Sequence, residues 1–251
     1  MGMRTITPRE CAHRFRSSRR TVAFSGAGIS TAAGIPDFRG PGGLYSSGRY
    51  DAQRIFDIDC FGADPREFFR FTRDLAAMLQ DLRPTFTHRL LARLERESLL
   101  EAVITQNIDP LHQQAGSRRV ICLHGNYHSS RCRQCGRSFD YAALLERLGR
   151  MDVPRCDCPA RGVIKPDVVF FGEPVLGLEE AMNLARGCEL MLVLGSSLTV
   201  YPAALVPQAA AGDVVVVNRG PVSMEAAPNH YFVQQGLDEF FTDVAGQLGL
   251  A

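Results

Sequence analysis

Short apolar runs, each followed at once by glycine or polar residues, recur along the chain. Continuous apolar runs of this length are typical of strands that are buried on both faces of a parallel sheet. Ligands bind to such sheets beyond the carboxyl ends of the strands. The pattern therefore predicts an α/β fold with a ligand site where the polar residues gather. The runs lie at residues 21–24, 102–105, 120–123, 168–171, 190–194 and 214–217.

Two segments interrupt this pattern. Residues 129–161 contain closely spaced cysteines, Arg-rich turns and a helical stretch at 141–148. Helical apolar spacing occurs at 65–82 and again at 87–100. The chain length suits one large domain with a smaller domain inserted. We therefore expect three parts. A sheet domain is formed by residues 1–40, 85–128 and 162–251, a helical insert by residues 41–84, and a cysteine-bearing module by residues 129–161.

Charge and composition exclude several classes of protein. The net charge is +1, so nothing in the overall field points to nucleic acid or to a membrane surface. Every apolar run is too short to cross a bilayer, and residues 1–20 lack the apolar segment of a secretory signal. We therefore expect a cytoplasmic protein. Lys165 is the only lysine, so the chain itself offers a single target for lysine chemistry.

Eight cysteines in a cytoplasmic chain indicate metal binding or reduced thiols rather than disulfides. Four of them form two close pairs, which are separated by twenty residues. Four thiolates in this arrangement suit a tetrahedral structural Zn²⁺, although the second pair is one residue shorter than usual. The alternative is a set of free thiols. The predicted zinc ligands are Cys132, Cys135, Cys156 and Cys158.

The first apolar run leads into Gly26-Ala-Gly-Ile-Ser30. Glycines after a strand let backbone N–H groups approach a diphosphate, and we expect this turn to open a helix whose N-terminus favours negative charge. The alternative is an ordinary tight turn between a strand and a helix. Thr31 stands where the dinucleotide fingerprint has its third glycine, which argues against a plain dehydrogenase.

Polar residues with catalytic potential follow the second and third runs. His124 directly follows a predicted strand, and a neutral imidazole suits a general base. On composition alone His88, His112 and His128 compete with it. The segment Gln106-Asn-Ile-Asp109 can hydrogen-bond ribose hydroxyls or a carboxamide. Its alternative interpretation is a capped loop, because Asp109 followed by proline begins a helix well.

Taken together and in order, these motifs resemble the sirtuins, the NAD⁺-dependent protein deacylases, and in particular their short bacterial members. The resemblance extends from about Thr21 to about Phe241. It implies a Rossmann-like doubly wound parallel sheet with a smaller domain made of the helical insert and the zinc module. The segments that carry it are Gly26–Ser30, Gly34–Gly40, Thr105–Asp109, His124-Gly125, the cysteine pairs, Lys165–Glu173, Gly195–Leu198 and Asn218.

The resemblance also implies which residues bind NAD⁺ as co-substrate. The nicotinamide end would be covered by Gly26, Ala27, Gly28, Thr31, Asp37, Phe38 and Arg39. The nicotinamide-ribose pocket would contain Gln106, Asn107, Ile108 and Asp109. The adenosine half would be held by Gly195, Ser196, Ser197, Asn218, Arg219, Gly220 and Leu237.

The partner implied by the resemblance is a protein or peptide that carries an acyl-lysine. Val169, Phe171 and Val200 would line the acyl-lysine tunnel, and the backbone at Gly172 and Glu173 would clamp the peptide as an added strand. The catalytic residues would be His124 and Asn107. In the mechanism that the resemblance implies, the acyl oxygen attacks C1′ of the ribose as nicotinamide leaves, and His124 then removes a ribose proton so that the 2′-hydroxyl can attack the amidate carbon. Hydrolysis then yields lysine and 2′-O-acyl-ADP-ribose, without a catalytic role for zinc.

Two other functions use the same pocket. A mono-ADP-ribosyltransferase would transfer ADP-ribose to a protein, and a non-catalytic module would only bind NAD or ADP-ribose. The presence of His124, Asn107 and the tunnel residues favours deacylation. Sirtuins that remove succinyl groups carry Tyr-x-x-Arg in the helix of the first insert, and the resemblance matches Thr72 and Leu75 to that motif. The sequence therefore predicts a preference for acetyl and other short neutral acyl groups.

Overall fold

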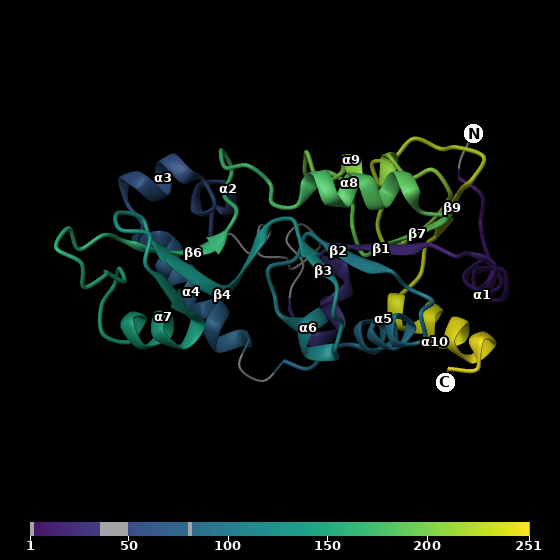
Figure 1. The fold of residues 1–251 in the computed structure, drawn as a ribbon, viewed down its shortest axis with the longest axis horizontal. Coiled ribbons are helices and arrows are strands. Elements are labelled where there is room, and N and C mark those ends of the chain that lie inside the picture. Colours follow the sequence, from purple (N-terminus) through teal and green to yellow (C-terminus); the bar gives the residue numbers. More distant parts are fainter. Residues whose placement is uncertain (1–2, 36–49, 80–81, 251) are drawn as a thin grey trace.

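The computed structural model describes residues 3–35, 50–79 and 82–250, and the protein has two lobes in a row (Figure 1). The larger lobe holds a six-stranded sheet whose strands run in the order β3-β2-β1-β7-β8-β9. All neighbouring strands are parallel. This is the strand order of the doubly wound dinucleotide-binding fold, and the order reverses between β1 and β7, where such sheets bind ligands. The strands are β1 (Thr21–Ser25), β2 (Ala102–Thr105), β3 (Val120–Cys122), β7 (Leu190–Leu194), β8 (Asp213–Val217) and β9 (His230–Val233).

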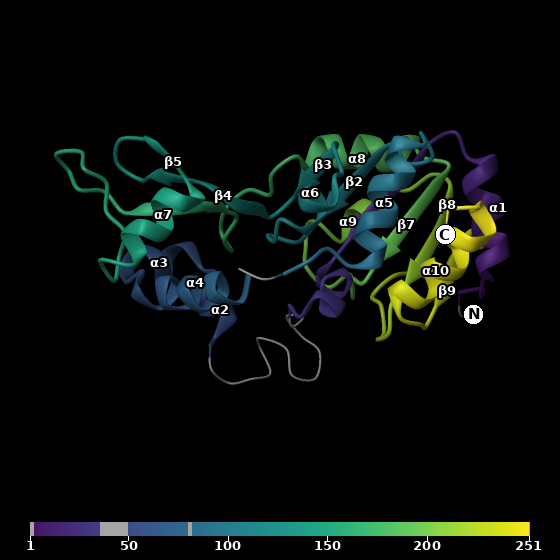
Figure 2. The ribbon, with the colours of Figure 1, turned by 90° about the horizontal axis from the view of Figure 1, so that it is seen from below.

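Helices cover both faces of the large sheet (Figure 2). One face packs against α1 (Pro8–Ser17), α5 (Phe86–Arg96) and α10 (Leu237–Leu248) through one apolar core. The other face packs against α8 (Leu178–Gly187) and α9 (Leu205–Gln208) through a second core. Strands β1 and β7 are buried along their whole length, because they lie between two neighbours and under helices on both sides.

The smaller lobe combines the helical insert and the cysteine-bearing module around one core. Its antiparallel sheet has the order β5-β4-β6, and four helices pack beside it. Phe68 lies 4.9 Å from Phe170 and 5.4 Å from Phe61 between ring centroids, so the aromatic side chains of the helical insert pack against the segment that follows β6. The elements are α2 (Ala52–Ile55), α3 (Ile58–Ala63), α4 (Arg66–Leu79), α7 (Tyr141–Leu148), β4 (Gly125–Cys132), β5 (Ser138–Asp140) and β6 (Ile164–Val168).

One predicted strand of the large sheet is wrong. The apolar run at 168–171 does not enter that sheet: β6 ends at Val168 and pairs antiparallel with β4. The run is apolar because its residues divide between two environments. Phe170 is buried in the core of the smaller lobe, whereas Phe171 is 44% exposed at the cavity described below. The sixth strand is β9, which the sequence pattern missed because only alternate residues of this edge strand are fully buried.

The predicted helix after Gly26 is also wrong. The chain instead forms two short 3₁₀ turns, Ala27–Ile29 and Thr31–Ala33. The backbone here is held by the turn that follows β7, because the Gly28 N–H donates to the Gly195 carbonyl at 2.8 Å. Gly34 then adopts φ of 100°, which ends the second turn. The hydrogen bond from Gly28 to the turn after β7 stands in place of the hydrogen bonds of a regular helix.

The predicted domain boundaries stay a prediction. The boundary before residue 129 falls inside β4, and the boundary before residue 162 lies two residues ahead of β6. Both strands belong to the small sheet. Within the part of the chain that the structure describes, no helix is both long and apolar enough to cross a membrane.

Candidate active site

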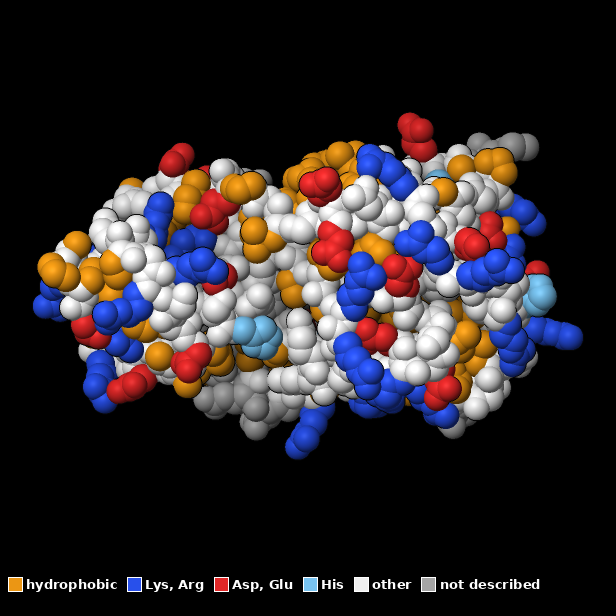
Figure 3. Space-filling model, in the orientation of Figure 1, with side chains coloured by type: hydrophobic (Ala, Val, Ile, Leu, Met, Phe, Trp, Pro, Cys, Tyr) orange, Lys and Arg blue, Asp and Glu red, His pale blue; other side chains and the backbone are white. Residues whose placement is uncertain are grey.

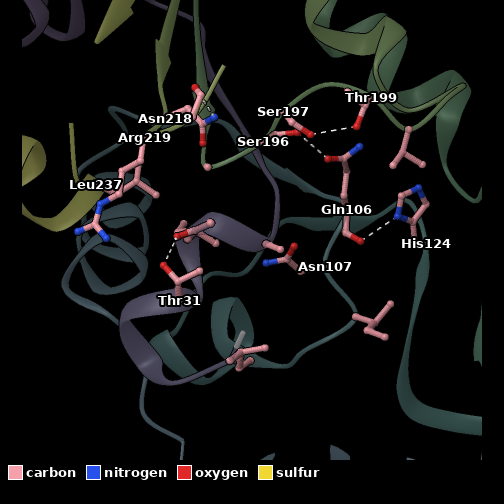
Figure 4. A pocket seen from close by; sticks show the side chains of 18 of the residues that line it. Thr31, Gln106, Asn107, His124, Ser196, Ser197, Thr199, Asn218, Arg219 and Leu237 are labelled. Atoms are coloured by element: carbon pink, nitrogen blue, oxygen red, sulfur yellow. Dashed lines mark hydrogen bonds between the residues drawn. The ribbon is translucent and has the colours of Figure 1, made fainter. Parts of the chain in front are cut away.

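A cavity of about 1410 Å³ lies at the carboxyl ends of the strands of the large sheet, where the two lobes meet. Segments that follow all six strands of that sheet contribute to its walls, and so do residues of β6 and of the helical insert. This is where a doubly wound sheet binds its ligand. Figure 4 shows how the labelled side chains from these separate segments converge.

Most of the predicted site residues line this one cavity. Gly26 and Asp109 are not among the lining residues and lie behind the wall, whereas Asp37, Phe38 and Arg39 lie outside the described residues. The lining residues that the sequence predicted are Ala27, Gly28, Thr31, Gln106, Asn107, Ile108, His124, Val169, Phe171, Gly172, Glu173, Gly195, Ser196, Ser197, Val200, Asn218, Arg219, Gly220 and Leu237.

The glycines after β1 are required by a close approach of two turns. A Cβ atom at Gly28 would lie 2.6 Å from Cα of Gly195, and a Cβ atom at Gly26 would lie 2.8 Å from Cβ of Ser196. These glycines therefore serve the close packing of the two turns. The same packing brings Gly28 and Gly195 together at the cavity wall, where their lack of side chains leaves room for a ligand backbone such as a diphosphate.

Gln106 provides a test of whether the cavity suits a polar co-substrate. Its Oε1 accepts a hydrogen bond from Ser196 Oγ at 2.9 Å. Its Nε2 is buried and makes no hydrogen bond within the described part of the chain, although the residue lines the cavity. A buried donor without a partner costs free energy, so it calls for an acceptor from a ligand. Carbonyl, hydroxyl and phosphate oxygens of NAD⁺ meet that requirement.

Asn107 is held in place by a short polar chain. Its Nδ2 donates to Ser30 Oγ at 3.2 Å, and that hydroxyl donates to the Asp109 carboxylate at 2.9 Å. Asp109 also accepts from the backbone N–H of Leu111, and burial raises the pKa of its carboxyl. Asp109 therefore contacts both Ser30 and the start of α6 (Leu111–Ala115), whose N-cap position is Pro110. The sequence analysis missed the role of Ser30, whose only signal was its place at the end of the glycine motif.

His124 is fixed in one orientation. Its Nδ1 lies 2.9 Å from the carbonyl oxygen of Gln106 (Figure 4). A carbonyl only accepts hydrogen bonds, so Nδ1 carries the hydrogen and the lone pair of Nε2 is left to accept a proton. Burial lowers the pKa of His124, which keeps the imidazole neutral near pH 7. A neutral imidazole held in this way can accept a proton at Nε2.

Part of the cavity wall is apolar. Val169, Phe171 and Val200 belong to it, together with residues that no local sequence pattern identified. The missed residues come partly from the helical insert, which no local pattern connects to the sheet. They are Ile35, Phe56, Met78, Val168 and Phe170.

The basic side chains near this apolar end point elsewhere. Arg73 donates to the carbonyls of Leu148 and Met151 at the end of α7, and Arg70 is exposed. Thr72 and Leu75 are buried in the smaller lobe and do not line the cavity. Among the described lining residues, Arg219 is the only lysine or arginine, and it lies beside Leu237 on the far side of the view from His124 (Figure 4).

The four paired cysteines come together in the smaller lobe. Their sulfur atoms all lie within 4.8 Å of one another. Cys132 and Cys158 are 3.9 Å apart between sulfurs, and Cys135 and Cys156 are 3.7 Å apart. A tetrahedral zinc with Zn–S bonds of about 2.3 Å separates its sulfurs by about 3.8 Å. The site therefore suits structural zinc, and four thiolate ligands leave no open position for catalysis.

Gly162 explains how the short Cys156-x-Cys158 pair completes this site. Its carbonyl accepts from the backbone N–H of Cys156 at 2.9 Å, which closes the loop behind the pair. A Cβ atom at Gly162 would lie 2.6 Å from the sulfur of Cys132. Only glycine leaves room for the loop to fold this tightly against the sulfurs.

A buried pair of histidines lies behind the cavity. His112 Nε2 lies 2.8 Å from Ser25 Oγ at the end of β1, and its ring centroid is 4.6 Å from that of His88. Burial lowers the pKa of both rings, that of His88 to about 4. His88 Nδ1 contacts the Thr85 hydroxyl, which caps α5. Both histidines are therefore structural and neutral, and neither competes with His124 as a base.

This pair predicts acid sensitivity. Between pH 6.5 and about 4 the unfolded chain protonates His88 while the folded chain does not, so the free energy of unfolding falls as pH falls, by roughly 3 kcal/mol from this group. Urea unfolding measured from pH 7.5 to 4.5 checks this expectation. His88→Gln should flatten the pH dependence, whereas His13→Gln, on an exposed position of α1, should leave it unchanged. Equal slopes for all three proteins would contradict the assignment.

Comparison with known sequences gives one consistent result. A family model described as the Sir2 family matches residues 26–202. An NAD-dependent protein deacetylase of Thermotoga maritima is 48% identical over 208 residues, which cover 81% of this chain and 83% of that protein. An NAD-dependent protein deacetylase of Cutibacterium acnes is 40% identical over 228 residues, covering 88% of this chain and 91% of that protein.

Solved structures agree with the sequences. A complex described as Sir2, p53 peptide and NAD⁺ superposes with a TM-score of 0.88 at 41% identity, covering 98% of this chain and 100% of that chain. A structure of Sir2Tm bound to a propionylated peptide has a TM-score of 0.86 at 39% identity, with the same coverage.

Proposed function

The chain belongs to the Sir2 family, and from this we propose how the residues of its cavity divide the work of an NAD-dependent protein deacylase. The activity is that of its relatives, with NAD⁺ as co-substrate and zinc as a structural ion in the four-cysteine site. The observation that carries the assignment of roles is His124, which lines the cavity with Nδ1 fixed on the Gln106 carbonyl.

The polar side of the cavity is proposed to bind NAD⁺. When bound, NAD⁺ supplies a glycosidic bond to nicotinamide that is already weakened by the positive charge on the leaving nitrogen. Gln106 would donate its unpartnered Nε2–H to an oxygen of the co-substrate. Asn107, oriented through Ser30 and Asp109, would bind at the nicotinamide-ribose end. Residues of the turns after β7 and β8, and the first residue of α10, would hold the adenosine half; they are Gly195, Ser196, Ser197, Asn218, Arg219, Gly220 and Leu237.

His124 is proposed to take a proton from a ribose hydroxyl. The Gln106 carbonyl fixes the tautomer, so Nε2 is the accepting atom. The lowered pKa keeps Nε2 unprotonated at neutral pH, which is the state that a base requires. The side chain of His124 contacts the carbonyl of Gln106, and its backbone carbonyl accepts from the Val169 N–H at 2.9 Å. His124 therefore lies between a polar segment and an apolar segment of the cavity wall. The imidazole would therefore lie where the two substrates react with each other.

The apolar side is proposed to receive the acyl-lysine. Val169, Phe171 and Val200 would contact its methylene chain, and the peptide backbone would pair with the segments around Gly172-Glu173 and 197–200. Phe171 and Tyr201 are 44% and 58% exposed, which is unusual for large apolar side chains in the absence of a partner. A peptide in the cleft would cover them.

We predict that the enzyme prefers acetyl-lysine to succinyl-lysine. No described lysine or arginine lines the apolar end, so a succinyl carboxylate would be buried without a counter-charge there. Such a charge costs several kcal/mol, which corresponds to a kcat/KM at least about 100-fold lower for the succinyl peptide. The measurement is kcat/KM on acetyl and succinyl forms of one peptide, with a butyryl form as the neutral control of similar length. A succinyl value equal to the acetyl value would contradict the prediction.

Product analysis separates deacylation from its alternatives. Mass spectrometry of reactions with an acyl-peptide panel and NAD⁺ should detect nicotinamide, free lysine peptide and acyl-ADP-ribose in equal amounts. A mono-ADP-ribosyltransferase would instead leave ADP-ribose on the peptide or on an added protein. A non-catalytic binding module would bind NAD⁺ without forming nicotinamide. Either of these results would overturn the proposed assignment.

A further inference from the structure

The only lysine of the sequence is withdrawn from solvent. Lys165 lies in β6, and its side chain is 11% exposed. Its Nζ donates to the Val168 carbonyl at 2.6 Å and to Glu173 Oε2 at 2.8 Å, and it lies 4.0 Å from the centre of the Phe170 ring. The mechanism described above does not use this ammonium group. Its contacts all lie within the segment that leads from β6 to the cavity.

Glu173 connects this charge to the backbone of a turn. The same Oε2 atom that binds Lys165 also accepts from the Phe170 N–H at 2.9 Å, and the Glu173 N–H donates to the Phe170 carbonyl at 3.0 Å. Residues 170–173 thus form a turn whose first and last residues are joined by two hydrogen bonds. Gly172 within them has φ of 91°, and a Cβ atom there would lie 2.8 Å from Ile58. Glycine adopts this conformation readily, whereas a side chain at this position would collide with Ile58, so the turn requires glycine here.

The helical insert holds the opposite side of the same turn. The Phe171 N–H donates to the Phe56 carbonyl at 2.7 Å, and the Ile58 N–H donates to the Phe171 carbonyl at 3.1 Å. The backbone of Phe171 is therefore fixed from one side by the insert, while Lys165 and Glu173 fix the next residues from the other side. Between these two supports the Phe171 side chain reaches the cavity.

We propose that Lys165 is a positioning residue for the acylated substrate. Its ammonium group, held by Glu173, keeps residues 170–173 in the conformation that presents Phe171 and the Gly172-Glu173 backbone to the peptide. The role rests on the proposed function of that turn in binding the acyl-lysine. The same contacts withhold the chain's only lysine amine from acyl donors, so the enzyme does not present an acyl-lysine of its own to the site.

The first test separates peptide binding from NAD⁺ binding. Lys165→Met keeps an unbranched apolar side chain but removes the donor, and the KM for an acetyl peptide should rise about tenfold or more, as expected for loss of hydrogen bonds to a charged group. The Kd for NAD⁺ should stay within about twofold, because the co-substrate lies on the polar side of the cavity. Glu173→Gln keeps an acceptor for the Phe170 N–H and should raise the peptide KM less than Lys165→Met does.

The matched control is Arg131→Met. Arg131 lies opposite Lys165 in the β4–β6 register, and its contact with Asp167 is on an exposed side chain. This variant removes a positive charge from the same sheet, so the peptide KM should stay at the wild-type value. An unchanged peptide KM in Lys165→Met, or an equal loss of peptide and NAD⁺ binding, would overturn the positioning role.

The second test detects the contact between Lys165 and Glu173 without an activity assay. Because Lys165 carries the only side-chain amine, acetylation by an N-hydroxysuccinimide ester reports on it alone once peptide mapping has set the N-terminus aside. Lys165 in the wild-type enzyme should react slowly, and Glu173→Gln should accelerate its modification. Equal rates would remove the proposed support. If the wild-type enzyme deacetylates no peptide, the proposed function fails, whereas the labelling rates still decide whether Glu173 holds Lys165.

Discussion

Replacing His124 with alanine should abolish deacetylation while NAD⁺ still binds. Loss of a general base typically costs 10²–10⁴-fold, so we expect kcat/KM to fall by about 10³-fold. The Kd for NAD⁺ should change little, because the polar contacts of Gln106 and Asn107 to Ser196 and Ser30 do not depend on the imidazole. Steady-state assays on an acetyl peptide and calorimetric titration with NAD⁺ measure the two quantities.

The pH dependence of the wild-type enzyme gives an independent check. Burial lowers the pKa of His124 from its ordinary value of 6.5. The base is therefore active above that lowered pKa, and kcat/KM should hold as pH falls through 6.5 and decline only at more acid pH. His128→Ala is the matched control, because His128 is exposed on β4 four residues away. Near-normal turnover in His124→Ala would remove the proposed mechanism.

Replacing Cys135 with alanine should unfold the cysteine-bearing module and remove activity indirectly. The four sulfurs lie at the spacing of a zinc-thiolate site, and three remaining ligands would bind the metal far more weakly. Structural zinc contributes about 10–16 kcal/mol of binding free energy in small peptides, most of which is free energy of folding. A loss of this order exceeds what the smaller lobe can tolerate.

Metal analysis and thermal unfolding test this expectation. The wild-type protein should contain one zinc per chain, and Cys135→Ala should contain little and unfold at a lower temperature. Cys60→Ala is the control, since Cys60 is an exposed cysteine in α3 of the same lobe and lies outside the four-cysteine cluster. Fully active enzyme without zinc would show that the metal is not a structural requirement. The larger lobe has its own cores, so NAD⁺ binding should be affected less than peptide deacetylation.

The alternative function, a module that only binds NAD or ADP-ribose, predicts a different result for His124→Ala. In that case neither the wild-type protein nor His124→Ala would form nicotinamide, because no turnover would exist to be lost. The lowered pKa and the fixed tautomer of His124 would then have no use. The product assay and the His124 variant therefore decide the same question by different routes.

Local sequence patterns determined much of this protein. Five of the six strands of the large sheet were predicted from continuous apolar runs, because burial on both faces of a sheet leaves a direct record in neighbouring residues. The positions of His124 and Gln106 at strand ends followed from the same pattern, since chain direction brings the carboxyl ends of parallel strands to one edge. The cysteine set was also readable, because ligand spacing in the chain reflects the geometry of the metal.

Other features depend on contacts between segments far apart in the sequence, and only the tertiary structure decided them. Residues 168–171 resemble a buried strand, yet Phe170 enters the core of the smaller lobe and Phe171 faces the cavity. Phe56 lines the cavity because the helical insert packs on that segment, and Gly162 closely approaches Cys132 in the cysteine site. The tautomer of His124 likewise depends on a carbonyl eighteen residues away. Periodicity and turn chemistry encode neighbours along the chain, whereas these contacts are set by the packing of whole elements, which leaves no local signature.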